Sequence, residues 1–545
     1  MDPSVDPCED FHEFACGRWN QRQSAQLLQT RTFELKQQIL DALYHQDKSE
    51  SSAMETARKF VDVCQNLDTR QLDKDIQNYA KRLGTVPIIG QTLENGREMP
   101  SILDSLELTA RYVYERYTYR GNIRTNHQPL ALIMTLEPKF TFWGRWNDWP
   151  RFDDSRPPYN NCRHFPLSKI YQEADRYVLQ DFLFINWIRG LKNAMDTRFK
   201  LLCRDRFVAH FYKIADYLLI KYLRNNKNLL PEVKAMAENV RRFFHQILDV
   251  NTWLHEKTKA KLKQQLDNVE ALIGYGSNAL NLTFIDELYE MVTVPQNPTS
   301  VELFQFEEQI TWNSMDLDVG DSFDIGRYTV AQLNAWNWLG TAIKIPIGYL
   351  EPPFFDPDWP LEFNYGLMGA TIGHEFTHSF DEQVELPAEN VGNDTNEFLE
   401  KRQCLVDQFG AVLYPNERLN ISLKGDGLAQ VKETLADNNG HRVAWLAYHD
   451  ERQKRYGRNP PKLPGLLEYT NDQIFFLANA QKQCGRLPVV SPDSKWMQFV
   501  HPVTRVRINE RVKNYEFFAT TFKCKLNSTM NPEKKCKVWR RLRRH

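Results

Sequence analysis

Two histidines four residues apart, His374 and His378, have a glutamate, Glu375, directly after the first of them. Side chains at positions i and i+4 lie on one face of an α-helix, so both imidazoles can reach a single zinc ion. Glu375 then lies beside the metal, where it can take a proton from a water molecule. The same pattern also arises by chance in helices that carry two unrelated histidines, so it needs support from the rest of the chain.

The residues around the motif favour a buried helix. Positions 368–373 are small or apolar, which suits a helix packed inside a protein. Buried ring nitrogens need polar partners, and one metal ion satisfies both histidines. Asp381, three residues after His378, lies on the same face and can accept a hydrogen bond from a ligand histidine. These features together indicate a zinc site.

A catalytic zinc site usually has three protein ligands and a water molecule, so a third ligand must come from another segment. The metzincin pattern would supply a histidine at position 384, but this chain has valine there. A later predicted helix offers Glu433 and Asp437, again four residues apart. In that arrangement Glu433 binds the metal, and Asp437 holds a ligand histidine in the required tautomer. From the residues alone, Glu397 and Glu400 remain rivals because they are nearer in the sequence.

The segments at 372–381 and 433–438 closely resemble the paired signatures of the neprilysin and endothelin-converting-enzyme family. Further matches follow in the same order along the chain. They are an N-terminal start at 6–17, a substrate-binding strand at Asn334 and Ala335, the segment 352–355 after it, and a C-terminal end at 530–539. The resemblance spans nearly the whole chain, and motifs in this order are highly specific.

The resemblance implies a role for each residue of the predicted site. The metal ligands would be His374, His378 and Glu433, the general base would be Glu375, and the carboxylates that orient the ligands would be Asp381 and Asp437. The implied cofactor is one Zn²⁺ per chain. Asp437 counts among the catalytic residues on this view, because it fixes the tautomer of a ligand histidine.

The resemblance also implies how a substrate is held. His501 would stabilise the transition state, and Arg507 would grip a substrate carbonyl. Asn334 and Ala335 would pair with the peptide backbone as an added strand. The implied activity is that of a zinc metalloendopeptidase, which hydrolyses internal bonds of oligopeptides and prefers a large apolar residue after the scissile bond.

Three departures from the family pattern leave an alternative open, a catalytically weak or inactive pseudopeptidase that binds peptides, although the three ligands and the base are all present, which favours the enzyme. The family's Asn-Ala-aromatic-Tyr run ends in Asn337 here, so one wall of the substrate site differs. Phe499 stands where the family usually has an aspartate, which reduces the support for a protonated His501. The stretch between Cys64 and Cys203 is shorter than in typical relatives.

Hydrophobic periodicity predicts helices through most of residues 30–270, whereas 328–350 mixes β-branched residues with Gly and Pro and predicts edge strands around Asn334. The expected fold class is therefore mainly α with a small β component (α+β). By resemblance it is a two-lobed gluzincin metallopeptidase. A helical N-terminal lid lobe, residues 1–310, would cover a thermolysin-like zinc catalytic lobe, residues 311–545, with the active site between them.

Net charge and hydropathy narrow the kinds of partner that the sequence predicts. The 545 residues carry 69 basic and 70 acidic side chains, a net charge of −1, which gives no reason to expect a nucleic-acid partner. No stretch approaches the roughly 20 apolar residues of a transmembrane helix, and no signal-peptide core follows the first residue. The expected partners are peptide substrates.

Nine cysteines fit either buried thiols or a disulfide framework. The family resemblance favours disulfides, and the pairs it implies are Cys8–Cys524, Cys16–Cys484, Cys64–Cys203 and Cys404–Cys536. Cys162 is left over for a possible intermolecular contact. Four glycosylation sequons, at Asn281, Asn393, Asn420 and Asn527, weakly favour secretion. The expected location is extracellular or at the cell surface, with the signal or membrane anchor absent from this chain.

Overall fold

The computed structural model describes residues 1–22, 27–45, 51–72, 74–76, 78, 195, 201–224, 228–316, 329–381, 394–416, 421–484 and 501–539. The chain divides into two compact units whose segments alternate along the sequence. The first unit comprises Met1–His45, Ala215–Leu282 and Gly320–His545, and the second comprises Gln46–Ile214 and Thr283–Val319. The assignment of residues 1–310 to a lid and of 311–545 to a catalytic lobe stays a prediction.

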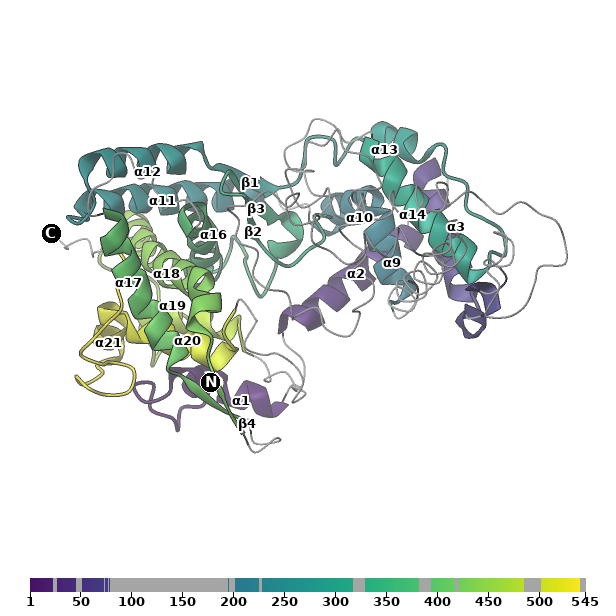
Figure 1. Ribbon diagram of the computed structural model, residues 1–545. Helices are drawn as coiled ribbons and strands as arrows, with labels where there is room; N and C mark the ends of the chain where they lie inside the picture. Colours follow the sequence, from purple (N-terminus) through teal and green to yellow (C-terminus); the bar gives the residue numbers. More distant parts are fainter. Residues whose placement is uncertain are drawn as a thin grey trace, which may run out of the picture. The chain divides into compact units, whose positions relative to one another are not determined.

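The described residues are mainly helical with few strands, so the predicted fold class is confirmed (Figure 1). The helices of the first unit are α1 (Phe11–Arg22), α2 (Leu27–His45), α11 (Leu229–Val250), α12 (Glu256–Asn268), α15 (Leu361–Asn364), α16 (Ala370–Asp381), α17 (Asp394–Gly410), α18 (Gly427–Tyr456), α19 (Asn471–Gln481), α20 (Thr504–Lys513) and α21 (Glu516–Phe522), with short helical turns η3 (Leu219–Leu223), η4 (Ile347–Tyr349) and η5 (Tyr365–Gly369).

The second unit is also helical in its described part. It contains α3 (Ser52–Asn66), the turn η1 (Thr69–Gln71), α9 (Cys203–His210) and α14 (Ser300–Asp316), while α10 (Tyr212–Leu218) and α13 (Leu282–Tyr289) lie at its boundaries. Arg206 and His210 of α9 both lie within ion-pair distance of the buried Glu307 carboxylate on α14. These contacts hold α9 to α14 beside the Cys64–Cys203 disulfide.

A three-stranded sheet and a hairpin make up the β component. β3 (Ala342–Pro346) lies in the middle of the sheet, parallel to β1 (Glu270–Gly274) and antiparallel to β2 (Trp336–Trp338). The prediction of edge strands around Asn334 is correct for β2 and wrong for β3, all of whose residues are buried. A central strand is covered on both faces, and β3 is apolar apart from the buried Lys344 at its centre. The hairpin pairs β4 (Leu413–Asn416) with β5 (Ile421–Lys424).

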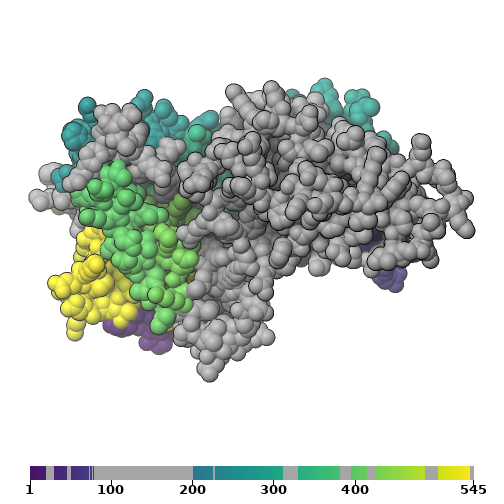
Figure 2. Space-filling view, viewed as in Figure 1, coloured from purple at the N-terminus to yellow at the C-terminus, as the bar shows by residue number. Residues whose placement is uncertain are grey.

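Four disulfides cross-link the chain: Cys8–Cys524, Cys16–Cys484, Cys64–Cys203 and Cys404–Cys536. All four pairs that the family resemblance implied are therefore confirmed. Two of them join the N-terminal segment to segments more than 460 residues away. Figure 2 accordingly shows the N-terminal segment in purple directly beside the C-terminal segment in yellow. Cys162 lies outside the described residues. In the described residues, no helix has the length and apolar character needed to cross a membrane.

His12 on α1 provides a pH-dependent contribution to stability. Its side chain is 5% exposed, and burial lowers its pKa from 6.5 to about 4, with Arg505 adding to the shift and Asp10 opposing it. Between pH 6.5 and 4 the unfolded chain therefore binds a proton that the folded chain does not. The free energy of unfolding should fall as the pH falls through this window, by about 2 kcal/mol at pH 5 relative to pH 7.5.

Urea unfolding at the two pH values measures this contribution. The difference between pH 7.5 and 5 should shrink by about 2 kcal/mol in His12→Gln, which cannot take up the proton. The control is His45→Gln, because His45 is exposed and its replacement should leave the difference unchanged. The same pH dependence in wild type and His12→Gln would contradict the assignment.

Candidate active site

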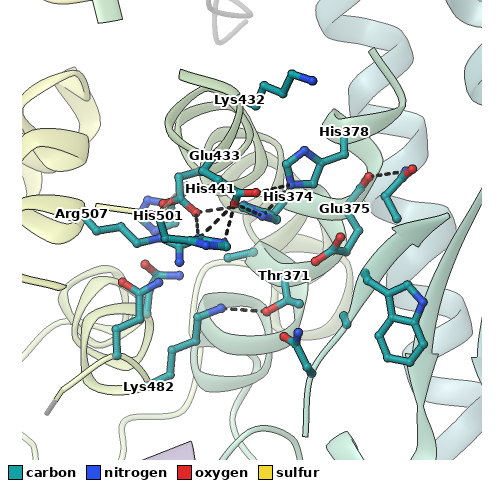
Figure 3. Close-up of a pocket in the computed structure, with 18 of the residues that line it drawn as sticks. Thr371, His374, Glu375, His378, Lys432, Glu433, His441, Lys482, His501 and Arg507 are labelled. Carbon is teal, nitrogen blue, oxygen red and sulfur yellow. Dashed lines mark hydrogen bonds and ion pairs between the residues drawn. The ribbon is translucent and has the colours of Figure 1, made fainter. Parts of the chain in front are cut away.

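Helix α16 carries the two predicted histidine ligands. Its apolar positions Ile372, Phe376 and Phe380 recur every four residues and are fully buried, which fixes one face of the helix against the core. The imidazoles of His374 and His378 are only partly buried and face a cavity, as Figure 3 shows. Both histidines therefore lie on one face of the helix, as their spacing predicts.

Helix α18 brings the later carboxylates to the same place. Its N-terminus is capped by Asp426, whose carboxylate accepts the backbone N–H of Ala429 at 2.9 Å. Glu433 and Asp437 follow in the second and third turns of the helix, four residues apart, and both line the cavity with the histidines. The rivals Glu397 and Glu400 lie on α17 and do not line it.

Two glycines set the distance between α16 and α18. A Cβ atom on Gly440 would lie 2.3 Å from the backbone nitrogen of His374, and one on Gly373 would lie 2.6 Å from the carbonyl oxygen of Gly440. Both approaches are far inside van der Waals contact, so only glycine permits them. The two helices therefore touch backbone to backbone about one turn from Asp437 and about two turns from Glu433.

Three donor atoms converge at this crossing. The Nε2 atoms of His374 and His378 are 3.0 Å apart. Nε2 of His374 lies 3.3 Å from Oε2 of Glu433, and Nε2 of His378 lies 3.6 Å from Oε1 of the same carboxylate. Tetrahedral zinc with bonds of about 2.1 Å holds its ligand atoms about 3.4 Å apart. The three spacings fit that requirement, and two imidazoles with one carboxylate are a donor set suited to Zn²⁺.

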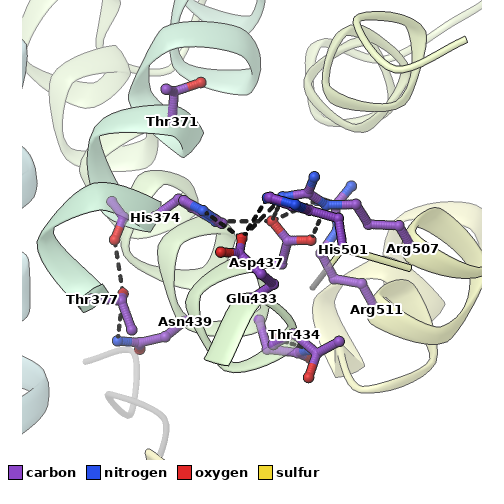
Figure 4. Close-up of polar contacts among 12 residues, drawn as sticks. Thr371, His374, Thr377, Glu433, Thr434, Asp437, Asn439, His501, Arg507 and Arg511 are labelled. Atoms are coloured by element: carbon purple, nitrogen blue, oxygen red, sulfur yellow. Dashed lines mark hydrogen bonds and ion pairs between the residues drawn. The ribbon is translucent and has the colours of Figure 1, made fainter. Parts of the chain in front are cut away.

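Asp437 orients one of the histidines. Its Oδ1 lies 2.9 Å from Nδ1 of His374, so that ring directs Nε2 at the donor cluster (Figure 4). The Arg507 guanidinium donates to both oxygens of the same carboxylate, at 2.5 and 2.8 Å. Burial alone would raise the pKa of Asp437, but the charge of Arg507 and the His374 hydrogen bond hold it well below its usual range. Asp437 is thus ionised at neutral pH.

Glu375 is buried beside the cluster and has no comparable anchor. Burial raises the pKa of its carboxyl, as does the charge of Glu433, while His374 and His378 oppose the rise. A carboxylate whose pKa is raised toward neutrality is a better base than an ordinary one. Its position next to His374 places it at the edge of the cavity (Figure 3).

His501 and Arg507 lie beside the two carboxylates of α18, Glu433 and Asp437. Nε2 of His501 lies 2.8 Å from Oε2 of Glu433, and its side chain is 48% exposed. Arg507, by contrast, is engaged with Asp437 in this structure. Its predicted contact with a substrate carbonyl stays a prediction.

The structure describes the remaining predicted residues only in part. Asn334 and Ala335 line the cavity immediately before β2, with Asn334 exposed and Ala335 buried. Asp381 is the last residue of α16, but its side chain lies outside the described part of the structure. Phe499 also lies outside the described residues.

Sequence analysis did not assign two residues that line the cavity. Asn337, noted only as a departure, donates to the carbonyl oxygen of Glu375 at 2.9 Å and to Ser379 Oγ at 2.7 Å, which ties β2 to the histidine helix. Lys482 projects its amine into the cavity and donates to Thr371 Oγ1 at 2.8 Å. The sequence offered a signal for Asn337 at a known motif, but none for Lys482.

The cavity itself has a volume of about 540 Å³ and is lined entirely by residues of the first unit. Its floor is the donor cluster, and its walls come from the segment before β2, from α16, α18 and α19, and from the region of His501 and Arg507. A volume of this size accommodates several substrate side chains.

Comparison with known proteins gives one consistent result. The sequence pattern of peptidase family M13 matches residues 334–538. Neprilysin-11 of Caenorhabditis elegans is 31% identical, over 99% of this chain and 79% of that protein, and endothelin-converting enzyme 1 of Bos taurus is 24% identical, over 85% and 65%.

Solved structures agree in fold. The Haemonchus galactose containing glycoprotein complex matches with a TM-score of 0.66 at 18% identity, over 98% of this chain and 97% of that one. The Mycobacterium tuberculosis zinc metalloprotease Zmp1, in complex with an inhibitor, matches with a TM-score of 0.63 at 15% identity, over 99% and 98%. At these identities the similarity establishes the shared architecture alone.

Proposed function

Because the chain belongs to peptidase family M13, the neprilysin and endothelin-converting-enzyme family, we propose that it is a zinc-dependent endopeptidase that hydrolyses internal bonds of oligopeptides. One observation carries the proposal. His374, His378 and Glu433 converge with spacings that suit one Zn²⁺, and Glu375 lies beside them at the edge of a substrate-sized cavity.

His374, His378 and Glu433 would hold the ion. When bound, Zn²⁺ supplies a Lewis acid for the substrate carbonyl and lowers the pKa of a water molecule. Asp437 accepts the Nδ1–H of His374 and so keeps Nε2 of that ring free as a ligand atom. Arg507 in turn fixes Asp437 through two hydrogen bonds.

The proton transfers fall to Glu375. It takes a proton from the attacking water and later delivers it to the leaving amine, an exchange that its raised pKa assists. His501 reaches the cluster from the other side, where its ring can donate to the oxyanion of the transition state. A preorganised donor of this kind typically contributes about 3–4 kcal/mol.

The substrate backbone would pair with the segment at Asn334 and Ala335. This segment leads into β2, which is the edge strand of the sheet and has β3 on one side alone among the described strands. A peptide can add to such an edge by main-chain hydrogen bonds. Residues 1–310 would act as the lid that limits substrates to peptides. By family similarity, the residue after the scissile bond would be large and apolar.

The proposed location is extracellular or at the cell surface. The four disulfides require an oxidising compartment to form and persist. Two of the sequon asparagines, Asn281 and Asn527, are exposed, as glycosylation requires. The remaining two sequons, at positions 393 and 420, lie outside the described residues.

Metal removal tests the proposed function. We expect purified protein to hold one zinc per chain by mass spectrometry of the metal. It should cleave members of a mixed library of quenched fluorescent peptides. Treatment with 1,10-phenanthroline should reduce the rate by more than about 100-fold, because no other group present supplies the Lewis acid. One equivalent of Zn²⁺ should restore it.

Two outcomes would count against the proposal in different ways. Cleavage that survives complete zinc removal would exclude the mechanism. One bound zinc with no cleavage of any library peptide would favour the peptide-binding pseudopeptidase instead.

A further inference from the structure

Lys482 is a cation built into the wall of the cavity. It caps the C-terminal end of α19, and its Nζ donates to Thr371 Oγ1 on α16 at 2.8 Å (Figure 3). The same Nζ lies 3.5 Å from the carbonyl oxygen of Leu367 in η5. Thr371 precedes Glu375 by four residues and therefore lies on the same face of α16. The ammonium group thus lies about one helical turn, roughly 5 Å, along the helix from the proposed base.

The charge of Lys482 has no direct counterion among the described residues. Its two polar contacts are both to neutral oxygens, and no described carboxylate forms an ion pair with it. Asp437 is already engaged with His374 and Arg507. An ammonium group in a partly buried site without an anion is poorly solvated. Binding of an anion beside it therefore stabilises its charged form.

The surroundings of Lys482 disfavour an isolated charge on its amine. Burial is the main cause that lowers its pKa to about 7; the guanidinium groups of Arg511 and Arg507 act in the same direction, while the charges of Asp437 and Glu375 oppose the shift. All three groups line the same cavity, where Arg507 is paired with Asp437 and Lys482 forms no ion pair with a described carboxylate. An incoming carboxylate reverses these effects and restores the charged form of the lysine.

The cavity walls beside Lys482 limit what can deliver the carboxylate. Tyr349, Phe354 and Ala370 supply apolar surface to the cavity that Lys482 lines, and Gln483 adds an amide. This combination suits a short side chain whose methylene groups contact the apolar surface while its end meets the ammonium. The side chain of Lys482 is itself partly exposed, so a ligand can reach it.

We propose that Lys482 makes this part of the cavity a subsite for a substrate carboxylate, so that the enzyme cleaves peptides beside an aspartate or glutamate residue. The proposal rests on the proposed peptidase function and replaces the expected preference for a large apolar residue. A free C-terminal carboxylate has the same chemistry, and the test separates it from a side chain.

The test compares peptides that differ at one residue. A set of C-terminally amidated, quenched fluorescent peptides would carry Glu, Gln, Leu or Lys at the residue on either side of the scissile bond, which is mapped by mass spectrometry. For wild type we expect kcat/KM to be about 10- to 100-fold higher for Glu than for the isosteric Gln, the usual range for a charge-assisted hydrogen bond. A free-acid peptide without Glu, cleaved equally well beside its C-terminus, would assign the subsite to the terminal carboxylate.

Three variants assign the preference to Lys482. Lys482→Met should abolish the Glu-over-Gln ratio, Lys482→Arg should retain it, and Lys482→Glu should invert it in favour of the Lys peptide. The matched control is Lys462→Met, because Lys462 is an exposed lysine outside the cavity lining and its loss should leave the ratio unchanged. Equal rates for Glu and Gln in wild type, or an unchanged ratio in Lys482→Met, would overturn the proposal.

Binding measurements separate this proposal from the peptidase activity. Fluorescence anisotropy of labelled Glu and Gln peptides on the Glu375→Gln variant gives a ratio of Kd values without any turnover. Selective binding of Glu with no cleavage by wild type would overturn the peptidase and keep the subsite. Unselective binding with cleavage would overturn the subsite and keep the peptidase.

Discussion

Glu375→Gln is expected to lower kcat for every cleaved peptide by about 10²- to 10⁴-fold, the usual contribution of a positioned general base. The amide has nearly the same shape as the carboxylate but cannot take a proton from water. Glu375 is not one of the three converging donor atoms, so the zinc content should remain at one per chain. The Kd for a bound peptide should change little, because the residue contributes to proton transfer and not to the grip on the substrate.

Parallel measurements of kcat, zinc content and peptide Kd check this expectation. Asp407→Asn, a change of a carboxylate on α17 outside the cavity lining, serves as a matched control and should leave all three unchanged. A Glu375→Gln enzyme that retains more than about a tenth of the wild-type kcat would exclude Glu375 as the base. Loss of zinc from the variant would show instead that the residue stabilises the metal centre.

Gly440→Ala is expected to lower the free energy of unfolding by about 2–3 kcal/mol and to weaken zinc binding at least tenfold. The new methyl carbon would lie 2.3 Å from the His374 backbone nitrogen, so α16 and α18 must separate. Alanine would otherwise stabilise a helix by up to about 1 kcal/mol relative to glycine, so a net loss reports the helix contact directly. Since the histidines lie on α16 and Glu433 on α18, separation of the helices also spreads the donor atoms.

Gly410→Ala is the matched control for this substitution. Gly410 also lies in a helix, but the nearest atom to an added Cβ is 3.6 Å away, an ordinary contact. Its unfolding free energy and zinc affinity should therefore stay within about 1 kcal/mol of wild type. Thermal unfolding and competition for zinc with a chelator measure both quantities, and equal behaviour of the two alanine variants would refute the role of the Gly373–Gly440 crossing.

Local periodicity predicted part of the site, and a family pattern predicted more. The i, i+4 spacing placed His374 and His378 on one face of a helix, as found, because helix geometry depends on sequence separation alone. The choice of Glu433 over Glu397 and Glu400 depends on which helix packs against α16, and single-sequence reasoning left it open. The four disulfides likewise followed from family resemblance, because spacing cannot fix connectivity.

What remained unpredicted depends on contacts between distant segments. Lys482 belongs to no motif, and it matters because the end of α19 lies against α16. Asn337 looked like a change in a substrate wall, whereas its amide joins β2 to the carbonyl of Glu375. β3 was expected at a sheet edge, yet β1, some 70 residues earlier, pairs with its other side. In each case the partner lies far away in the sequence, where local patterns carry no information.

The pairing of Cys8 with Cys524 has a consequence for biosynthesis. A ribosome adding about 5–20 residues per second needs roughly 25–100 s to span the 516 residues between them. For all that time Cys8 and Cys16 lack their native partners, although they are the first two cysteines to emerge and lie only eight residues apart. The N-terminal helix α1 must wait for α19 and α20, so the first unit closes only when synthesis is nearly complete. Nascent chains therefore carry an incomplete first unit while they are being made, with two unpaired cysteines at its start.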